Sequence, residues 1–174
     1  MAKTKPKHNH QVINQTINFF WTILCMAPVY WFWAIEDLNL YFYLFAGIAL
    51  VMGILPERIL SAFTFSSRKE FYENLGVKFI RKYVQNGTLA KSMSDPHTHK
   101  IINNKSEARK YLKSIQLYER YHWICLIFFL LTAVYSFLQG NLIVGLLILG
   151  VNILYNLCPL MLQQYNKLRL LRIL

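Results

Sequence analysis

Residues 122–162 read HWICLIFFLLTAVYSFLQGNLIVGLLILGVNILYNLCPLML, two apolar runs separated by the turn Gln139-Gly140-Asn141. The runs cover residues 122–138 and 142–162, and each is close to the ~20 residues that an α-helix needs to cross a hydrocarbon core. A helix satisfies its backbone hydrogen bonds internally, which is required in lipid. The stretch therefore predicts two antiparallel membrane-spanning helices.

Two further apolar runs precede this pair, at residues 18–35 and 38–55. The first continues through Trp31-Phe32-Trp33 without a small-residue cleavage site, so we interpret it as a membrane helix and not as a cleaved signal peptide. Four spans use most of a chain of 174 residues. We expect an all-α integral membrane protein that forms a single domain over residues 1–174.

Charge distribution predicts the orientation. The chain has a formal net charge of +11, and its basic residues lie in a tail (1–13), a long central segment (56–121) and a C-terminal tail (163–174). The turn between the first two runs carries Glu36 and Asp37 instead. The positive-inside rule places these basic regions, and both termini, on the cytoplasmic side of the cell membrane. The excess of basic residues is explained by membrane topology and by attraction to anionic lipid or an anionic cosubstrate. It does not require nucleic-acid binding.

The central segment divides into three parts. Aromatic and apolar residues alternate with basic ones over residues 67–84, which predicts an amphipathic helix in the membrane interface. Residues 85–104 contain the turn signals Asn86-Gly87 and Asp95-Pro96 and are expected to form a loop. From Lys105 a charged helical stalk is expected to run through Glu119 directly into the third span.

Glu119 and His122 are three residues apart on this predicted helix, so they share one face. A carboxylate beside an imidazole fixes its tautomer and raises its basicity, as a general base that deprotonates a hydroxyl requires. The alternative is a hydrogen-bonded pair that fixes the stalk to a neighbouring helix.

A polar stripe follows one face of the fourth span, with steps of four, three, four and three residues: Asn152, Asn156, Pro159, Gln163 and Asn166. Amides that face lipid lack partners, so the stripe should point into the bundle. Glu119, His122, Gln163 and Asn166 are then expected to meet at one depth. The alternative role for Asn152 and Asn156 is interhelical hydrogen bonding.

The basic residues of the C-terminal tail and the histidine pairs suggest few additional functional sites. Lys167, Arg169 and Arg172 are candidates either for binding phosphates or for anchoring the chain at the membrane surface. The pairs His8/His10 and His97/His99 lack further ligands, so we expect no metal site. No bound cofactor is expected either.

Glu119-Arg-Tyr-His122-Trp123, followed by Asn156 and by Gln163-Gln-Tyr165-Asn166-Lys167-Leu-Arg169-Leu170, resembles the glycosyl-4,4'-diaponeurosporenoate acyltransferase family. These enzymes place a fatty acyl chain on the sugar of staphyloxanthin-type carotenoids. The resemblance covers about residues 56–174 and is strongest in the C-terminal box. Gln164 and Lys167 stand where the family has arginine, which weakens a bidentate phosphate clamp.

The resemblance implies acyl transfer to a hydroxyl of a lipid or glycolipid at the cytoplasmic leaflet. It implies an acyl-CoA or similar donor as cosubstrate. In that scheme His122 is the general base and Glu119 orients it. The residues expected to bind the substrates are Asn156, Gln163 and Asn166 at the acyl carbonyl or oxyanion, Lys167 and Arg169 at donor phosphates, and Tyr165 within the same box. The competing interpretation is a non-catalytic membrane subunit or lipid-binding protein whose polar face contacts a partner.

Overall fold

The computed structural model describes residues 8–83, 105–172 and 174, and it contains helices and no strand within them. In chain order the elements are α1 (His8–Ile35), α2 (Leu40–Ile54), α3 (Glu57–Leu60), the 3-10 turn η1 (Ser61–Phe63), α4 (Lys69–Asn74), α5 (Val77–Tyr83), α7 (Lys105–Leu138), α8 (Leu142–Asn152), the π-helical turn η3 (Ile153–Leu157) and α9 (Cys158–Leu171).

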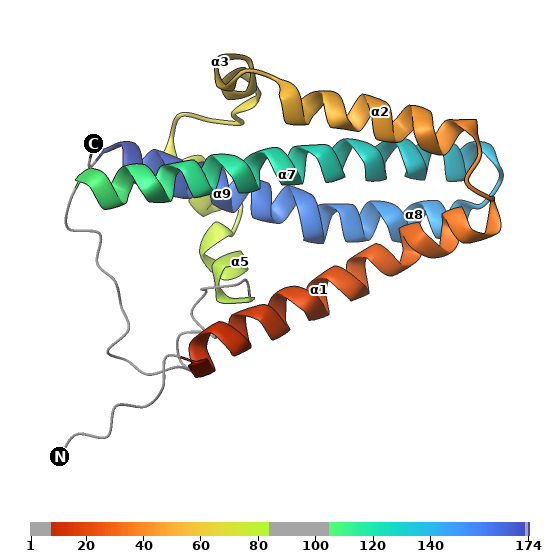
Figure 1. The fold of residues 1–174 in the computed structure, drawn as a ribbon, viewed down its shortest axis with the longest axis horizontal. Helices are drawn as coiled ribbons and strands as arrows, with labels where there is room; N and C mark the ends of the chain where they lie inside the picture. The colour runs from red at the N-terminus through yellow and green to blue at the C-terminus, as the bar shows by residue number, and fades with distance from the viewer. Residues whose placement is uncertain (1–7, 84–104, 173) are drawn as a thin grey trace.

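The long helix α7 forms the centre of the bundle (Figure 1). α2 packs along one side of α7, and α8 and α9 run back along another side. α1 packs against α8 and η3, and its N-terminal half diverges from α9 in Figure 1. The predicted helical stalk is confirmed, because the 34 residues of α7 are one uninterrupted helix.

Among the residues that the structure describes, three helical segments are long and apolar enough to cross a membrane: Asn14–Ile35, Lys105–Leu138 and Leu142–Leu171. The predicted second span, residues 38–55, is shorter than expected. The 15 residues of α2 rise by about 22 Å, less than the ~30 Å of a hydrocarbon core. A fourth span results only if α2 and the segment Glu57–Phe63, bent from it by 102°, are counted together. The bend follows Pro56, whose missing N–H ends the helix.

The apolar core lies where α1, α7 and α8 meet. Its buried members are Val29, Phe32, Trp33, Phe129, Ala133 and Ile148. The Trp33 indole N–H donates to Thr132 Oγ1 at 3.2 Å, so the one polar atom of this ring is paired. Tyr135 stacks against Trp33 with ring centroids 5.6 Å apart. These contacts join the first apolar run to the third.

The segment predicted as one interfacial helix, residues 67–84, is two short helices in the structure. α4 ends at Asn74 and α5 begins at Val77, and Gly76 between them has a φ of 78°. That backbone conformation favours glycine and ends a helix. Tyr72 and Val77 are fully buried against Leu162 and Tyr165 of α9. The pair therefore packs on the bundle itself. The predicted loop at 85–104 lies outside the described residues.

Both predicted tails are partly helical. α1 begins at His8, within the expected N-terminal tail, and residues 163–171 of the expected C-terminal tail belong to α9. Leu170 of α9 is buried with Ala108 and Ile115 of α7, because the stalk provides an apolar surface there. The box that follows the fourth apolar run therefore contributes Gln164, Tyr165 and Leu170 to the buried interior of the bundle.

We expect Gly145→Ala to destabilise the α7–α8 hairpin. A methyl group at this position would overlap Phe137 Cε1 and Cδ1, so the ring or the helix must move. Overpacking of this kind costs about 1–3 kcal/mol. Thermal unfolding of the purified protein followed by tryptophan fluorescence should show a lower Tm. Gly150→Ala, also in α8 and with no atom within 4 Å, is the control and should not lower the Tm. Equal losses in both variants would contradict this packing.

Candidate active site

Glu119 is fully buried in the interface between α7 and α9. Its Oε1 accepts a hydrogen bond from Gln164 Nε2 at 3.2 Å, and its Oε2 accepts one from Lys167 Nζ at 3.2 Å. Lys167 also donates to Glu57 Oε1 at 2.8 Å. A buried carboxylate requires such partners, since an unpaired charge away from water is costly. Glu119 thus joins the stalk to α9.

Arg120 completes the group that we call the ionic cluster, which consists of Glu57, Glu119, Arg120 and Lys167. The Arg120 guanidinium lies 3.6 Å from Glu57 Oε2 and donates to the Gly53 carbonyl at 2.9 Å. Two carboxylates therefore balance two cations, and the cluster joins the end of α2 and α3 to α7 and α9. Lys167, predicted to bind donor phosphates, is engaged by two carboxylates of the chain.

Gln164 uses both ends of its amide in this interface. Its Oε1 accepts from the Phe65 backbone N–H at 3.0 Å and lies 3.0 Å from the Tyr72 hydroxyl. Its Nε2 lies 3.3 Å from the Phe63 carbonyl, in addition to its bond with Glu119. Only 1% of the side chain is exposed. An arginine at this position would have no acceptor for the Phe65 N–H and the Tyr72 hydroxyl. The glutamine side chain is therefore required by the hydrogen bonds of this interface.

His122 lies on a different side of α7 from Glu119. Side chains three residues apart on an α-helix differ by about 60° in their direction around the helix axis. Glu119 faces α9. The His122 imidazole lies beside Tyr155 of η3, with ring centroids 6.1 Å apart. The expected hydrogen bond between Glu119 and His122 is not formed among the described residues. His122 Nδ1 is buried and has no hydrogen-bond partner among them.

Asn156 supplies the complementary unpaired atom. Its side chain is fully buried beside the imidazole, and its Nδ2 donates to Asn152 Oδ1 at 2.8 Å. Asn152 Nδ2 donates in turn to the Leu126 carbonyl at 3.1 Å. Asn156 Oδ1 has no partner among the described residues. An imidazole nitrogen and an amide oxygen, both buried and unpaired, therefore occupy the same part of the bundle.

A ladder of three hydroxyl groups, which we call the hydroxyl ladder, connects α7, η3 and α1 beside the imidazole. Tyr121 and Tyr155 lie 3.2 Å apart at their oxygens, and Tyr155 and Thr22 lie 2.9 Å apart. Thr22 donates to the Asn18 carbonyl at 2.8 Å, and a carbonyl can only accept. All three contacts are satisfied when Tyr121 donates to Tyr155 and Tyr155 donates to Thr22. The ladder fixes the middle of α1 to the site.

Because of the π-helical turn, the second half of the polar stripe does not lie on the inward helix face that its spacing predicted. Asn152 and Asn156 point inward as expected. A π-turn accommodates one additional residue, so positions beyond it rotate by about 100° relative to a continuous α-helix. The inward positions then become Leu160, Gln164 and Lys167. Pro159 is the second residue after the turn, and its missing N–H is compatible with the break in α-helical bonding.

The remaining predicted residues lie outside these contacts. Gln163 and Asn166 are half-buried and make no side-chain hydrogen bond among the described residues. The Tyr165 hydroxyl donates to Glu73 Oε1 at 2.9 Å, which ties α4 to α9. Hydrogen bonds from Lys78 and Tyr165 hold the pKa of the Glu73 carboxyl below its usual range. Arg169 is exposed and lies over the Tyr165 ring at 5.7 Å.

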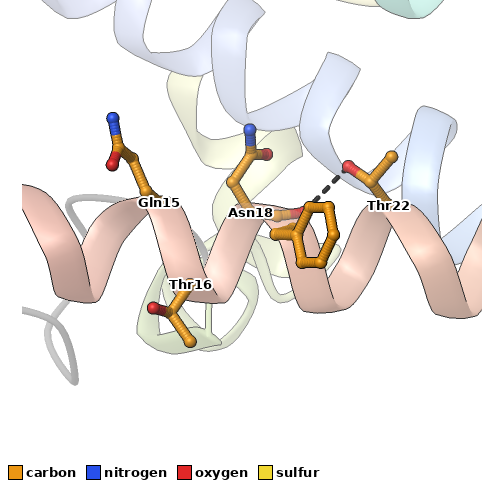
Figure 2. Close-up of a pocket in the computed structure, with 5 residues that line it drawn as sticks. Gln15, Thr16, Asn18 and Thr22 are labelled. Atoms are coloured by element: carbon orange, nitrogen blue, oxygen red, sulfur yellow. Dashed lines mark hydrogen bonds between the residues drawn. The ribbon is translucent and has the colours of Figure 1, made fainter.

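A hollow of about 480 Å³ lies along the N-terminal half of α1. It is lined by Gln15, Thr16, Asn18, Phe19 and Thr22. Figure 2 shows Gln15, Asn18 and Thr22 on the side of α1 that faces the C-terminal helices, and Thr16 on the opposite side. The hollow is open to the surface, and all of its lining residues belong to α1. One of them, Thr22, also belongs to the hydroxyl ladder.

In the described part of the chain, three or four helices are long and apolar enough to span a membrane, and buried polar groups lie between them. The sequence model of the glycosyl-4,4'-diaponeurosporenoate acyltransferase family matches residues 56–174, and the chain belongs to this family. It is therefore an acyltransferase of the carotenoid glycoside type, and the alternative of a non-catalytic subunit is set aside. No curated protein and no solved structure matches the chain significantly.

The match covers α3 to α9 and so includes the ionic cluster, His122, Tyr155 and Asn156. It does not include α1 or α2. Sequence reasoning named Glu57 only as one of several polar residues at this depth, and it missed the contacts of Gln164 and Tyr72 and the hydroxyl ladder. The sequence did place Gln164 next to Gln163 of the polar stripe. A shift of the inward face by one residue would have identified it.

Proposed function

We propose that this protein transfers a fatty acyl chain from a thioester donor such as acyl-CoA to a sugar hydroxyl of a carotenoid glycoside at the cytoplasmic leaflet. The observation that carries the assignment is the His122 imidazole, buried at Nδ1 beside Tyr155, in a chain of an acyltransferase family. An imidazole is the side chain best suited to take a proton from a hydroxyl near neutral pH.

In the proposed step, His122 accepts the proton of the sugar hydroxyl while the hydroxyl oxygen attacks the thioester carbonyl carbon. A C–O bond forms and the C–S bond breaks, and the proton then passes from the imidazole to the leaving thiolate. No oxidant or reductant is needed. The pairing of Nδ1–H with Asn156 Oδ1 would leave the Nε2 lone pair available as the base. Asn156 thus takes the orienting role that the sequence suggested for Glu119.

Glu119 is proposed as a positioning residue. Its bonds to Gln164 and Lys167 fix the helical turn of α7 that precedes His122. Because these bonds cross from α7 to α9, they also set the distance between the stalk and the C-terminal box. The role is indirect, since the carboxylate contacts neither the imidazole nor the hollow.

Donor phosphates are proposed to contact Arg169. Its guanidinium is exposed and has no ion pair among the described residues, whereas Lys167 is neutralised by Glu57 and Glu119. Gln163, Asn166 and Tyr165 lie on the same helix and are the remaining candidates for contact with the donor. The basic termini and central segment favour the cytoplasmic side, where acyl-CoA is available.

Expression of the chain in a host that accumulates the carotenoid glycoside tests the function. Mass spectrometry of extracted pigments should reveal a new species heavier than the glycoside by one fatty acyl group. Mild alkaline treatment should return this species to the glycoside, because an ester is cleaved under those conditions. Unchanged pigment in cells that contain the folded protein would refute the proposal.

A further inference from the structure

We propose that Gln15, Asn18 and Thr22 form the binding face for the sugar headgroup of the acceptor, so that α1 determines which glycolipids are accepted. This inference rests on the proposed function and names the part of the site that selects the acceptor. It concerns a helix outside the region that matches the family, residues 56–174. We call these three side chains the α1 polar face.

The α1 polar face is built from one side of a helix. Positions 15, 18 and 22 follow steps of three and four residues, so their side chains align along α1. Figure 2 shows all three directed to the C-terminal helices. The hollow that they line is shallow and open to the surface, so these side chains would contact a ligand from one side.

The chemistry of the lining selects a neutral, hydroxyl-rich ligand. The five residues around the hollow supply two amides, two hydroxyls and one aromatic ring, and none is charged. Amides and hydroxyls both donate and accept hydrogen bonds, which matches the alternating capacity of sugar hydroxyls. A phosphorylated donor would require cations, and no Lys or Arg lines this hollow. The acceptor therefore fits the hollow better than the donor does.

The position of the amides gives a second reason to expect a polar ligand. Gln15 and Asn18 are exposed in the first turns of the segment Asn14–Ile35, which is long and apolar enough to span a membrane. An amide directed at lipid loses its hydrogen bonds, so such side chains face water, protein or a polar ligand. The start of a span lies at headgroup level, which is where the sugar of a membrane glycolipid resides.

The hydroxyl ladder connects this face to the base. Thr22 lines the hollow and accepts from Tyr155, whose ring lies beside the His122 imidazole. Asn156 follows Tyr155 in η3 and carries the fully buried, unpartnered Oδ1. A sugar held by Gln15 and Asn18 would thus present its hydroxyls to the part of the bundle that contains the unpaired imidazole nitrogen and amide oxygen.

The test compares the binding of two ligands to the full-length protein in lipid nanodiscs. The ligands are glycosyl-4,4'-diaponeurosporenoate and the same carotenoid acid without its sugar. Wild type should bind the glycoside more tightly, and Asn18→Leu should reduce this preference by about tenfold, since each lost hydrogen bond to the sugar weakens binding. Gln15→Leu should act in the same direction. The KM for acyl-CoA should be unchanged in both variants.

Ile23→Ala is the control, because Ile23 is an exposed residue of α1 that does not line the hollow. It should retain the wild-type preference. A preference unchanged in both Asn18→Leu and Gln15→Leu, with wild-type Tm, would overturn the inference even if acyl transfer is normal. Absence of acyl transfer by wild type would instead refute the proposed function, while a sugar preference that depends on Asn18 would still support the α1 polar face.

Discussion

His122→Ala is expected to lower the rate of acyl transfer by about 10²–10⁴-fold, the usual contribution of a general base. The substitution removes the imidazole, and no other described residue next to Tyr155 and Asn156 has a comparable base. Truncation to alanine also removes a half-buried ring, and the companion variant His122→Gln keeps much of that volume, so the two variants separate loss of the base from loss of packing. The rate is measured with purified protein in nanodiscs, with labelled acyl-CoA and the carotenoid glycoside.

His122→Gln serves as the companion variant, because it keeps a polar side chain and removes the base. Both variants should bind the glycoside like wild type and should lose kcat. If either variant retains wild-type kcat, another group takes the proton, and the role given to His122 is wrong. A loss of Tm in both variants would indicate a structural role for the imidazole instead.

Lys167→Met is expected to produce the largest loss of stability, about 3–5 kcal/mol, which is the cost of leaving a buried charge without its partner. Lys167 is the cation that bonds directly to Glu119, and Glu119 is fully buried. The Gln164 amide alone would remain beside the carboxylate. The Tm of the purified variant, followed by tryptophan fluorescence, measures the effect.

The double variant Glu119→Gln/Lys167→Met distinguishes a buried ion pair from simple loss of packing. A neutral amide no longer needs the ammonium, so the double variant should recover much of the stability lost in Lys167→Met, as coupled neighbours do. Lys113→Met, at an exposed position of α7, is the control and should leave the Tm unchanged. Additive losses in the double variant would contradict the ion pair.

The α7–α8 hairpin and the uninterrupted stalk could be predicted because long apolar runs with short polar turns leave few alternatives in lipid. The shortness of α2 could not be predicted as easily. Residues 40–55 contain no charged or amide side chain, and hydropathy does not reveal that the N-cap Asn39 and Pro56 restrict the helix to fifteen residues. The predicted interfacial helix is likewise interrupted by one local feature, the positive φ of Gly76.

The sequence predicted which residue types form the candidate site. It did not predict which positions after the π-helical turn face that site. Glu119 and Asn156 are buried, as the cost of exposing them to lipid requires. The contact of Glu119 with Gln164, in place of Gln163, depends on the π-helical turn, which shifts the inward face by one residue. A periodicity argument assumes a constant rotation per residue, so it cannot include such a turn. The Thr22 to Tyr155 contact joins positions 133 residues apart, and no local pattern encodes it.

Incubation of the purified wild-type protein with isotopically labelled acyl-CoA and glycosyl-4,4'-diaponeurosporenoate in nanodiscs, followed by mass spectrometry, tests the central claim most directly. We predict a labelled acyl ester on the sugar of the glycoside, formed by wild type and lost in His122→Ala. Label that appears only as free fatty acid, or an ester formed equally by His122→Ala, would contradict acyl transfer to the sugar through His122.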